Sequence, residues 1–262
     1  LSTDAGMNLR AVRQVYGGGH VLALPRSMAM ADVEELARKL AERADVEYAE
    51  PDRQMFATLV PTDTQFPQQW DMRESAVAPG GASLLDAWDI TTGSPNLVMA
   101  VVDTGVLPHR DFGGRLLPGY DFISNAVKSN DGGGRDNNAS DPGDWLTTSE
   151  AASMRTTARS SSWHGTHVAG TMGASGNSGQ GIAGINWQSL ILPVRALGKG
   201  GGSSSDIADA IAWASGAPVA GVPNNPTPAR VINLSLGGSG ACSRTTQAAI
   251  DAALERQAVV VV

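Results

Sequence analysis

Hydrophobic positions gather in short runs through most of the chain, and these runs alternate with amphipathic segments. The apolar runs predict strands at residues 97–102, 190–196, 231–236 and 259–262. The segments between them have helical spacing or small residues, and they predict helices at 84–89, from 164, at 204–214 and at 245–256. Near-continuous apolar strands separated by helices are typical of a parallel sheet covered on both faces. The pattern therefore predicts an α/β fold with a parallel sheet flanked by helices.

The first part of the chain has a pattern of its own. Apolar residues recur at helical spacing over 31–43, between strand-like segments at 20–24 and 46–49, which together predict a β-α-β unit. A loosely patterned segment then leads into the larger domain. We predict a small α+β module at 1–57 and the larger domain at 58–262.

Composition excludes several classes of protein. The chain has 262 residues, 42% of them hydrophobic, which is enough for a sizeable core. Its net charge of −7 and scattered Lys and Arg residues favour neither nucleic acid nor an anionic membrane as partner. No apolar run approaches the roughly 18 residues of a membrane span, and no intact signal peptide is visible.

Two polar residues stand where a hydrolase would need them. Asp103 ends an apolar strand, and His164 opens a helix rich in Gly and Ala. A carboxylate that orients an imidazole makes a general base. An ordinary turn aspartate and a structural histidine remain the alternatives at this stage.

A metal pair is a further alternative, because His164 and His167 are three residues apart. The sequence has no HExxH pattern and its spacing suggests no third ligand of the kind catalytic zinc prefers. A metal-dependent hydrolase is thus the weaker interpretation.

Three ordered motifs carry a family resemblance. The sequences VDTG at 102–105, HGTHVAG at 164–170 and NLSLGG at 233–238 resemble successive signature blocks of the subtilisin-like serine proteases. The resemblance implies a subtilisin-like fold and a serine endopeptidase zymogen with an Asp-His-Ser triad in that chain order. It also implies that 1–57 is a propeptide, which acts as an intramolecular chaperone and inhibitor.

The resemblance assigns roles to individual residues. His164 becomes the general base and Asp103 the residue that orients it. The segment Ser235, Leu236 and Gly237 would pair with the backbone of a polypeptide substrate, and Gly201 and Gly202 would lie on the substrate's other side. Glycines that serve only as turns are the alternative reading.

The sequence departs from the family at the residues that would complete the catalytic site. Family members place an oxyanion-hole Asn just after the strand expected at 259–262 and the nucleophilic serine later, and both are absent from these residues. We therefore expect a C-terminally incomplete catalytic domain that is inactive alone and is completed by its missing C-terminal part. A non-catalytic, peptide-binding or inhibitory remnant is the alternative.

The resemblance also implies calcium as a structural cofactor, since hard oxygen ligands suit this ion. Asp63, Asp111 and Asn177 would form one site. A long insertion at 124–162 has little periodicity and suggests a second site, with a solvated acidic loop as the alternative. The acidic residues of that second site are Asp131, Asp136, Asp141 and Asp144.

The remaining expectations concern processing and location. Cys242 is the single cysteine, and by resemblance it would pair with a cysteine beyond residue 262 in an oxidising compartment. Propeptide cleavage is expected within 54–59. The complete protein is expected to be secreted and monomeric, with polypeptide substrates and its own propeptide as partners.

Overall fold

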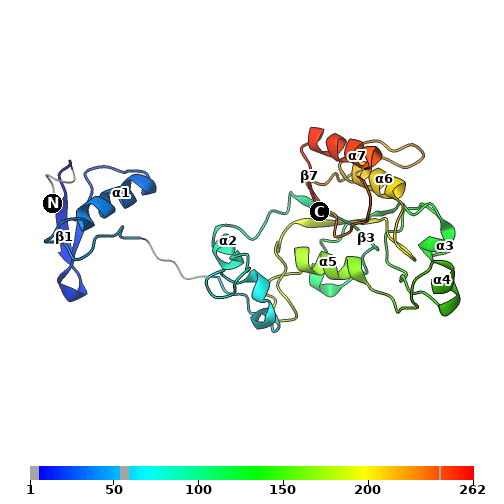
Figure 1. Cartoon of the computed structure of the whole chain (residues 1–262), viewed down its shortest axis with the longest axis horizontal. Coiled ribbons are helices and arrows are strands. Elements are labelled where there is room, and N and C mark those ends of the chain that lie inside the picture. The colour runs from blue at the N-terminus through cyan, green and yellow to red at the C-terminus, as the bar shows by residue number, and fades with distance from the viewer. Residues whose placement is uncertain (1–5, 54–58, 242) are drawn as a thin grey trace. The chain divides into compact units, whose positions relative to one another are not determined.

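A computed structural model describes residues 6–53, 59–241 and 243–262. Cys242 and residues 54–58 of the expected processing segment lie outside the described residues. The chain divides into two compact units, Leu1–Ala57 and Thr58–Val262 (Figure 1), and each is described by itself.

The first unit is a hairpin followed by a helix. Strand β1 (Arg10–Gln14) pairs antiparallel with β2 (His20–Ala23), and helix α1 (Met30–Ala41) buries Leu36 and Leu40. The strand expected at 46–49 does not form, so the order is β-β-α and the expected β-α-β order was wrong. Gly17 and Gly18 adopt φ of 82° and 88°, which lets the chain turn back so that β1, which the sequence did not predict, pairs with β2.

The second unit is built on a five-stranded sheet with the order β4-β5-β3-β6-β7. All of its strand pairs are parallel, which confirms the predicted α/β architecture. The strands are β3 (Val98–Asp103), β4 (Tyr120–Asp121), β5 (Leu190–Arg195), β6 (Val231–Asn233) and β7 (Val259–Val261). Strand β3 lies at the centre, where every one of its residues is buried.

Helices cover both faces of this sheet (Figure 1). Side chains alternate along β3, so Val102 packs in the core beneath α6 (Ser204–Ala214) and α7 (Arg244–Glu255). Val101 packs on the opposite face, against Ala169 of α5 (His164–Gly173). Each fully buried valine stabilises the fold by roughly 1.5–3 kcal/mol, and burial on both faces holds β3 rigidly. The residue at the end of β3 is therefore well fixed.

A separate aromatic cluster anchors the start of the second unit. Helix α2 (Leu84–Ile90) inserts Trp88 between Phe66 and Trp187, with ring centroids 5.9 and 4.8 Å apart. Three short 3₁₀ helices complete this region and the loop after β3: η2 (Phe66–Gln68), η3 (Trp70–Met72) and η4 (Arg110–Phe112).

The insertion at 124–162 is more ordered than its sequence pattern indicated. It contains the short helices α3 (Ala126–Ser129) and α4 (Thr148–Ser153). Asn125 caps the first, and Thr147 with Glu150 forms a capping box on the second. Within the described ranges, no helix is long and apolar enough to cross a membrane.

Candidate active site

The carboxyl ends of the parallel strands meet at one edge of the sheet, which is where sites form in such folds. Asp103 is the last residue of β3, and β3 lies between β5 and β6. The segments that leave β5 and β6 therefore run on either side of Asp103.

Asp103 and His164 form a close pair. Nδ1 of His164 lies 2.8 Å from Oδ1 and 2.9 Å from Oδ2 of Asp103. An ionised carboxylate only accepts hydrogen bonds, so Nδ1 carries the proton and the Nε2 lone pair is left to accept another. The Asp103 side chain is 0% exposed, whereas that of His164 is 44% exposed. The buried carboxylate thus fixes a ring whose other nitrogen is accessible.

Backbone contacts hold Asp103 in place. Oδ1 accepts a hydrogen bond from the amide of Thr104 at 2.7 Å. The Asp103 carbonyl accepts from the amides of Ala196 and Leu197 at 2.8 and 3.1 Å, just past the end of β5. These bonds satisfy the buried polar groups of the residue and leave its carboxylate directed at His164.

His164 is positioned by an unusual helix start. The residue before it, Trp163, has φ of 52° and ψ of 30°, a left-handed conformation that costs a non-glycine residue roughly 1–3 kcal/mol. The amide of Gly165 donates to Oγ1 of Thr104 at 2.9 Å, which ties the helix to the end of β3. On the other side, Asp144 accepts from the amide of Ser162 at 2.6 Å. The strained turn is therefore held from both ends.

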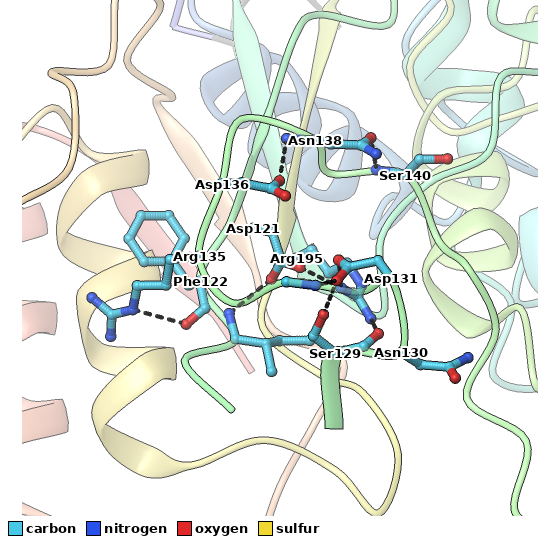
Figure 2. A network of polar contacts seen from close by, with 12 residues as sticks. Asp121, Phe122, Ser129, Asn130, Asp131, Arg135, Asp136, Asn138, Ser140 and Arg195 are labelled. Atoms are coloured by element: carbon cyan, nitrogen blue, oxygen red, sulfur yellow. Dashed lines mark hydrogen bonds and ion pairs between the residues drawn. The ribbon is translucent and has the colours of Figure 1, made fainter. Parts of the chain in front are cut away.

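A buried ion-pair network around Arg195, the strand partner of Asp103, was not predicted from the sequence (Figure 2). Arg195, the last residue of β5, contacts the carboxylates of Asp121 and Asp131. Burial raises the pKa of Asp121 to about 7, although Arg195 and the amide of Ile123 act against the rise. One signal for the network exists in the sequence: Arg195 is the only charged residue in an apolar run predicted to be a buried strand.

The residues expected to border a substrate lie where β5 and β6 end. Ser235 and Gly237 are exposed in a segment without regular secondary structure after β6, with Leu236 half-buried between them. Gly201 has φ of 94° and open space where a Cβ would stand. Gly202 differs, because a Cβ there would lie 2.2 Å from the carbonyl oxygen of Ala196. Its missing side chain is thus required by packing of the turn.

Two residues of the first expected calcium site, Asp63 and Asn177, are in direct contact, and the charge of Asp63 acts on the third, Asp111. Asp63, 2% exposed, accepts from the amide of Asn177 at 2.6 Å, and Oδ1 of Asn177 accepts from Oγ1 of Thr62 at 3.0 Å. Burial raises the pKa of Asp111, and the negative charge of nearby Asp63 raises it further. Two carboxylates and an amide oxygen are of the type that Ca²⁺ prefers.

The acidic residues of the insertion have separate contacts instead. Asp131 contacts Arg195 and Ser129, Asp136 accepts from the amide of Asn138, and Asp141 accepts from Oγ1 of Thr104. Among the residues that the structure describes, no three acidic, His or Cys side chains form a cluster that would hold a metal. The expected second site is therefore not assembled from these carboxylates, because they contact different partners and do not meet at one point.

His167 does not join His164 in a metal pair. It is exposed on α5, whereas Nδ1 of His164 is occupied by Asp103. The arrangement suits an oriented base rather than a metal centre.

Comparison with known proteins identifies relatives of this chain. The profile of the subtilase family matches residues 94–262. An extracellular protease of Xanthomonas campestris pv. campestris is 47% identical over 256 residues, which cover 98% of this chain and 43% of that protein. An extracellular basic protease of Dichelobacter nodosus is 39% identical, with the same two coverages.

A solved structure gives the same result for the fold. A protease from Pseudoalteromonas arctica superposes with a TM-score of 0.72 at 53% identity, over 78% of this chain and 58% of that one. The chain spans about two fifths of the length of the curated relatives it matches, as the 43% coverage of both shows.

Proposed function

The chain belongs to the subtilase family, and from this premise we propose that it contributes the Asp-His half of the catalytic triad of a secreted serine endopeptidase. The observation that carries the proposal is the contact of His164 Nδ1 with both oxygens of the buried Asp103 carboxylate, at 2.8 and 2.9 Å. This contact produces the tautomer that a general base requires.

In the proposed reaction, Nε2 of His164 takes the proton of a serine hydroxyl as that oxygen attacks the substrate carbonyl. The imidazolium that forms is stabilised by Asp103, and it returns the proton to the leaving amine as the peptide bond breaks. The low exposure of Asp103 strengthens this stabilisation, since little water screens the two charges.

We further propose that the nucleophilic serine and an oxyanion-hole donor lie outside residues 1–262. Among the described residues, no serine hydroxyl forms a hydrogen bond with Nε2 of His164, which supports this division. Without these two groups the base has nothing to activate. Residues 1–262 alone are then expected to be inactive.

The proposed substrate is an extended polypeptide. It would add as a strand beside the exposed segment Ser235–Leu236–Gly237, with Gly201 on its other side. Both segments follow strands that flank β3, so a peptide between them would pass above Asp103 and His164. Small residues allow the close approach of two backbones.

Calcium is proposed at Asp63, Asp111 and Asn177. The fit rests on the donor type and on the mutual proximity of the two carboxylates, whose repulsion a divalent cation would remove. The ion would hold residues 60–63 against the loop that contains Asn177, and so fasten the start of the second unit.

The first unit is proposed to be a propeptide that inhibits the protease until it is cleaved, and the relatives named extracellular proteases support a secreted location. Purification of the natural full-length protein tests the proposal as a whole. We expect hydrolysis of casein that a serine-directed fluorophosphonate abolishes, and an N-terminal sequence of the active species that begins near residues 54–59. An absence of hydrolysis after complete processing would contradict the proposal.

A further inference from the structure

Arg195 is a buried guanidinium next to the site, and the proposed mechanism does not use it. It is the parallel-strand partner of Asp103 in the register of β3 and β5, and its side chain is 1% exposed. A buried charge is expensive unless every donor is satisfied, so its contacts indicate why it is placed there.

The guanidinium of Arg195 is held on three sides. Nη1 donates to the carboxylates of Asp121 and Asp131, the latter at 3.0 Å, and Nη2 donates to the carbonyl of Ser129 (Figure 2). The third nitrogen, Nε, donates to the carbonyl oxygen of Thr104 at 3.1 Å. A planar guanidinium with fixed donor directions, anchored in this way, restricts the position of the Thr104 carbonyl.

Thr104 in turn contacts Asp103 and the residue that follows His164. Its amide donates to Oδ1 of Asp103 at 2.7 Å, and its hydroxyl accepts from the amide of Gly165 at 2.9 Å. The same hydroxyl donates to Asp141 at 2.6 Å. Thr104 therefore links the end of β3 to the start of α5, and Arg195 holds the backbone carbonyl of Thr104.

We propose that Arg195 is a positioning residue for the Asp103–His164 pair and acts through Thr104. The insertion supplies Ser129 and Asp131, so it takes part in this positioning although it does not contact His164. The inference rests on the proposed function in one respect: the pair must be the catalytic base for the positioning to affect turnover.

The test replaces the planar guanidinium of Arg195 by the ammonium group of lysine. Arg195→Lys keeps the positive charge but cannot serve the Thr104 carbonyl and both carboxylates at once. In the natural full-length protein we expect kcat for a peptide substrate to fall by about tenfold to a hundredfold, with KM within about twofold, because orientation rather than binding is lost. In the proton NMR spectrum, the resonance of the His164 Nδ1 proton should shift and exchange faster with water.

Arg135→Lys is the matched control. Arg135 also bridges two carboxylates, Asp206 and Asp209, and donates to the carbonyl of Phe122 at 3.0 Å, but it has no contact with Thr104. Its variant should retain kcat and the Nδ1 proton resonance. Equal losses in both variants would overturn the proposal, since they would reflect a general effect of removing arginine ion pairs.

A second variant tests the proposal in case Arg195→Lys does not fold. The triple change Arg195→Met, Asp121→Asn and Asp131→Asn removes the charges together, and so avoids an unpaired buried carboxylate. It should shift the Nδ1 proton resonance in the same direction; a folded triple variant with the wild-type resonance and kcat would overturn the inference.

The two proposals can fail separately. If the wild type lacks proteolytic activity but the resonance still depends on Arg195, the proposed function is wrong and the positioning role of Arg195 holds. If the wild type is a protease and no Arg195 variant changes kcat or the resonance, the positioning fails alone.

Discussion

A Cβ placed on Gly165 would lie 2.3 Å from the carbonyl oxygen of Gly105, closer than any real contact of this kind. The same Cβ would be 3.2 Å from Oδ1 of Asp103. Helix α5 can therefore approach the end of β3 only because residue 165 has no side chain. We predict that Gly165→Ala displaces α5, destabilises the second unit by about 1–3 kcal/mol and weakens the Asp103–His164 contact. Urea unfolding and the Nδ1 proton resonance measure the two effects.

Gly170→Ala is the control for this prediction. It lies on the same helix, where a Cβ would meet only Cδ1 of Ile182 at 3.9 Å, an ordinary contact. Because alanine favours helix over glycine, this variant should be as stable as the wild type or up to about 1 kcal/mol more stable. Equal stability of the two variants would show that the close approach at Gly165 does not matter.

Asp103→Asn tests the orientation of the imidazole. An asparagine NH₂ in this position donates to Nδ1 and moves the ring proton to Nε2, so the base can no longer accept a proton. We expect kcat of the full-length protein to fall roughly 10⁴-fold with little change in KM. Asp89→Asn is the control, since Asp89 is exposed and, among the residues that the structure describes, accepts only from the amide of Leu59 at 2.8 Å. A loss below about tenfold at Asp103 would contradict the role.

Asp121 should make stability fall as pH rises. Burial raises its pKa from 3.8 to about 7, so between these values the folded chain holds a proton that the unfolded chain has released. The folded state then binds more protons, and the free energy of unfolding decreases with pH by up to about 1.4 kcal/mol per unit.

The measurement is urea unfolding of the wild type and of Asp121→Asn between pH 5 and 7. This window lies above the range in which carboxyls with lowered pKa values, such as Glu150 at about 2, begin to take up protons. The difference in slope between the two proteins isolates Asp121. Parallel slopes would show that its carboxyl is ionised throughout the window.

Removal of calcium should destabilise the second unit. At a free calcium concentration of a hundred times the Kd, the bound ion contributes about 2.7 kcal/mol to the free energy of unfolding. A chelator would then lower the melting temperature by several degrees. Asp63→Asn should abolish the effect of the chelator, whereas Asp136→Asn should retain it, because the Asp136 carboxylate accepts from the amide of Asn138 and is not a ligand of the proposed site. Coincident melts of the wild type with and without chelator would argue against an occupied structural site.

Much of the parallel sheet and its helices is predictable from hydrophobic pattern. Strands β3 and β5 are apolar on both faces up to their last residues, Asp103 and Arg195, so the pattern predicts them clearly, and α6 agrees with its expected residues. Strand β1 was missed because every residue of it is exposed, so no buried face marks it. Helix α4 was missed although Thr147 and Glu150 have the spacing of a capping box, a local signal that needs no periodicity.

For the site, motifs alone identified Asp103 and His164 as partners, and the structure brings them together. The residues that hold them were not visible in the same way. Thr104 forms hydrogen bonds through its amide, hydroxyl and carbonyl. Two of its partners, Gly165 and Arg195, are distant in sequence, so only the folded structure shows these contacts. The partners of Arg195 are distant in sequence, 64 residues away for Asp131 and 74 for Asp121, and spacing could not connect them.

Labelling by a serine-directed fluorophosphonate tests most directly whether His164 is the catalytic base. The natural full-length protein should be labelled, His164→Ala should not, and His167→Ala should be labelled like the wild type, since His167 is exposed and lies outside the pair. An unlabelled wild type, or equal labelling of the wild type and His164→Ala, would contradict the assignment of Asp103 and His164 to a catalytic triad.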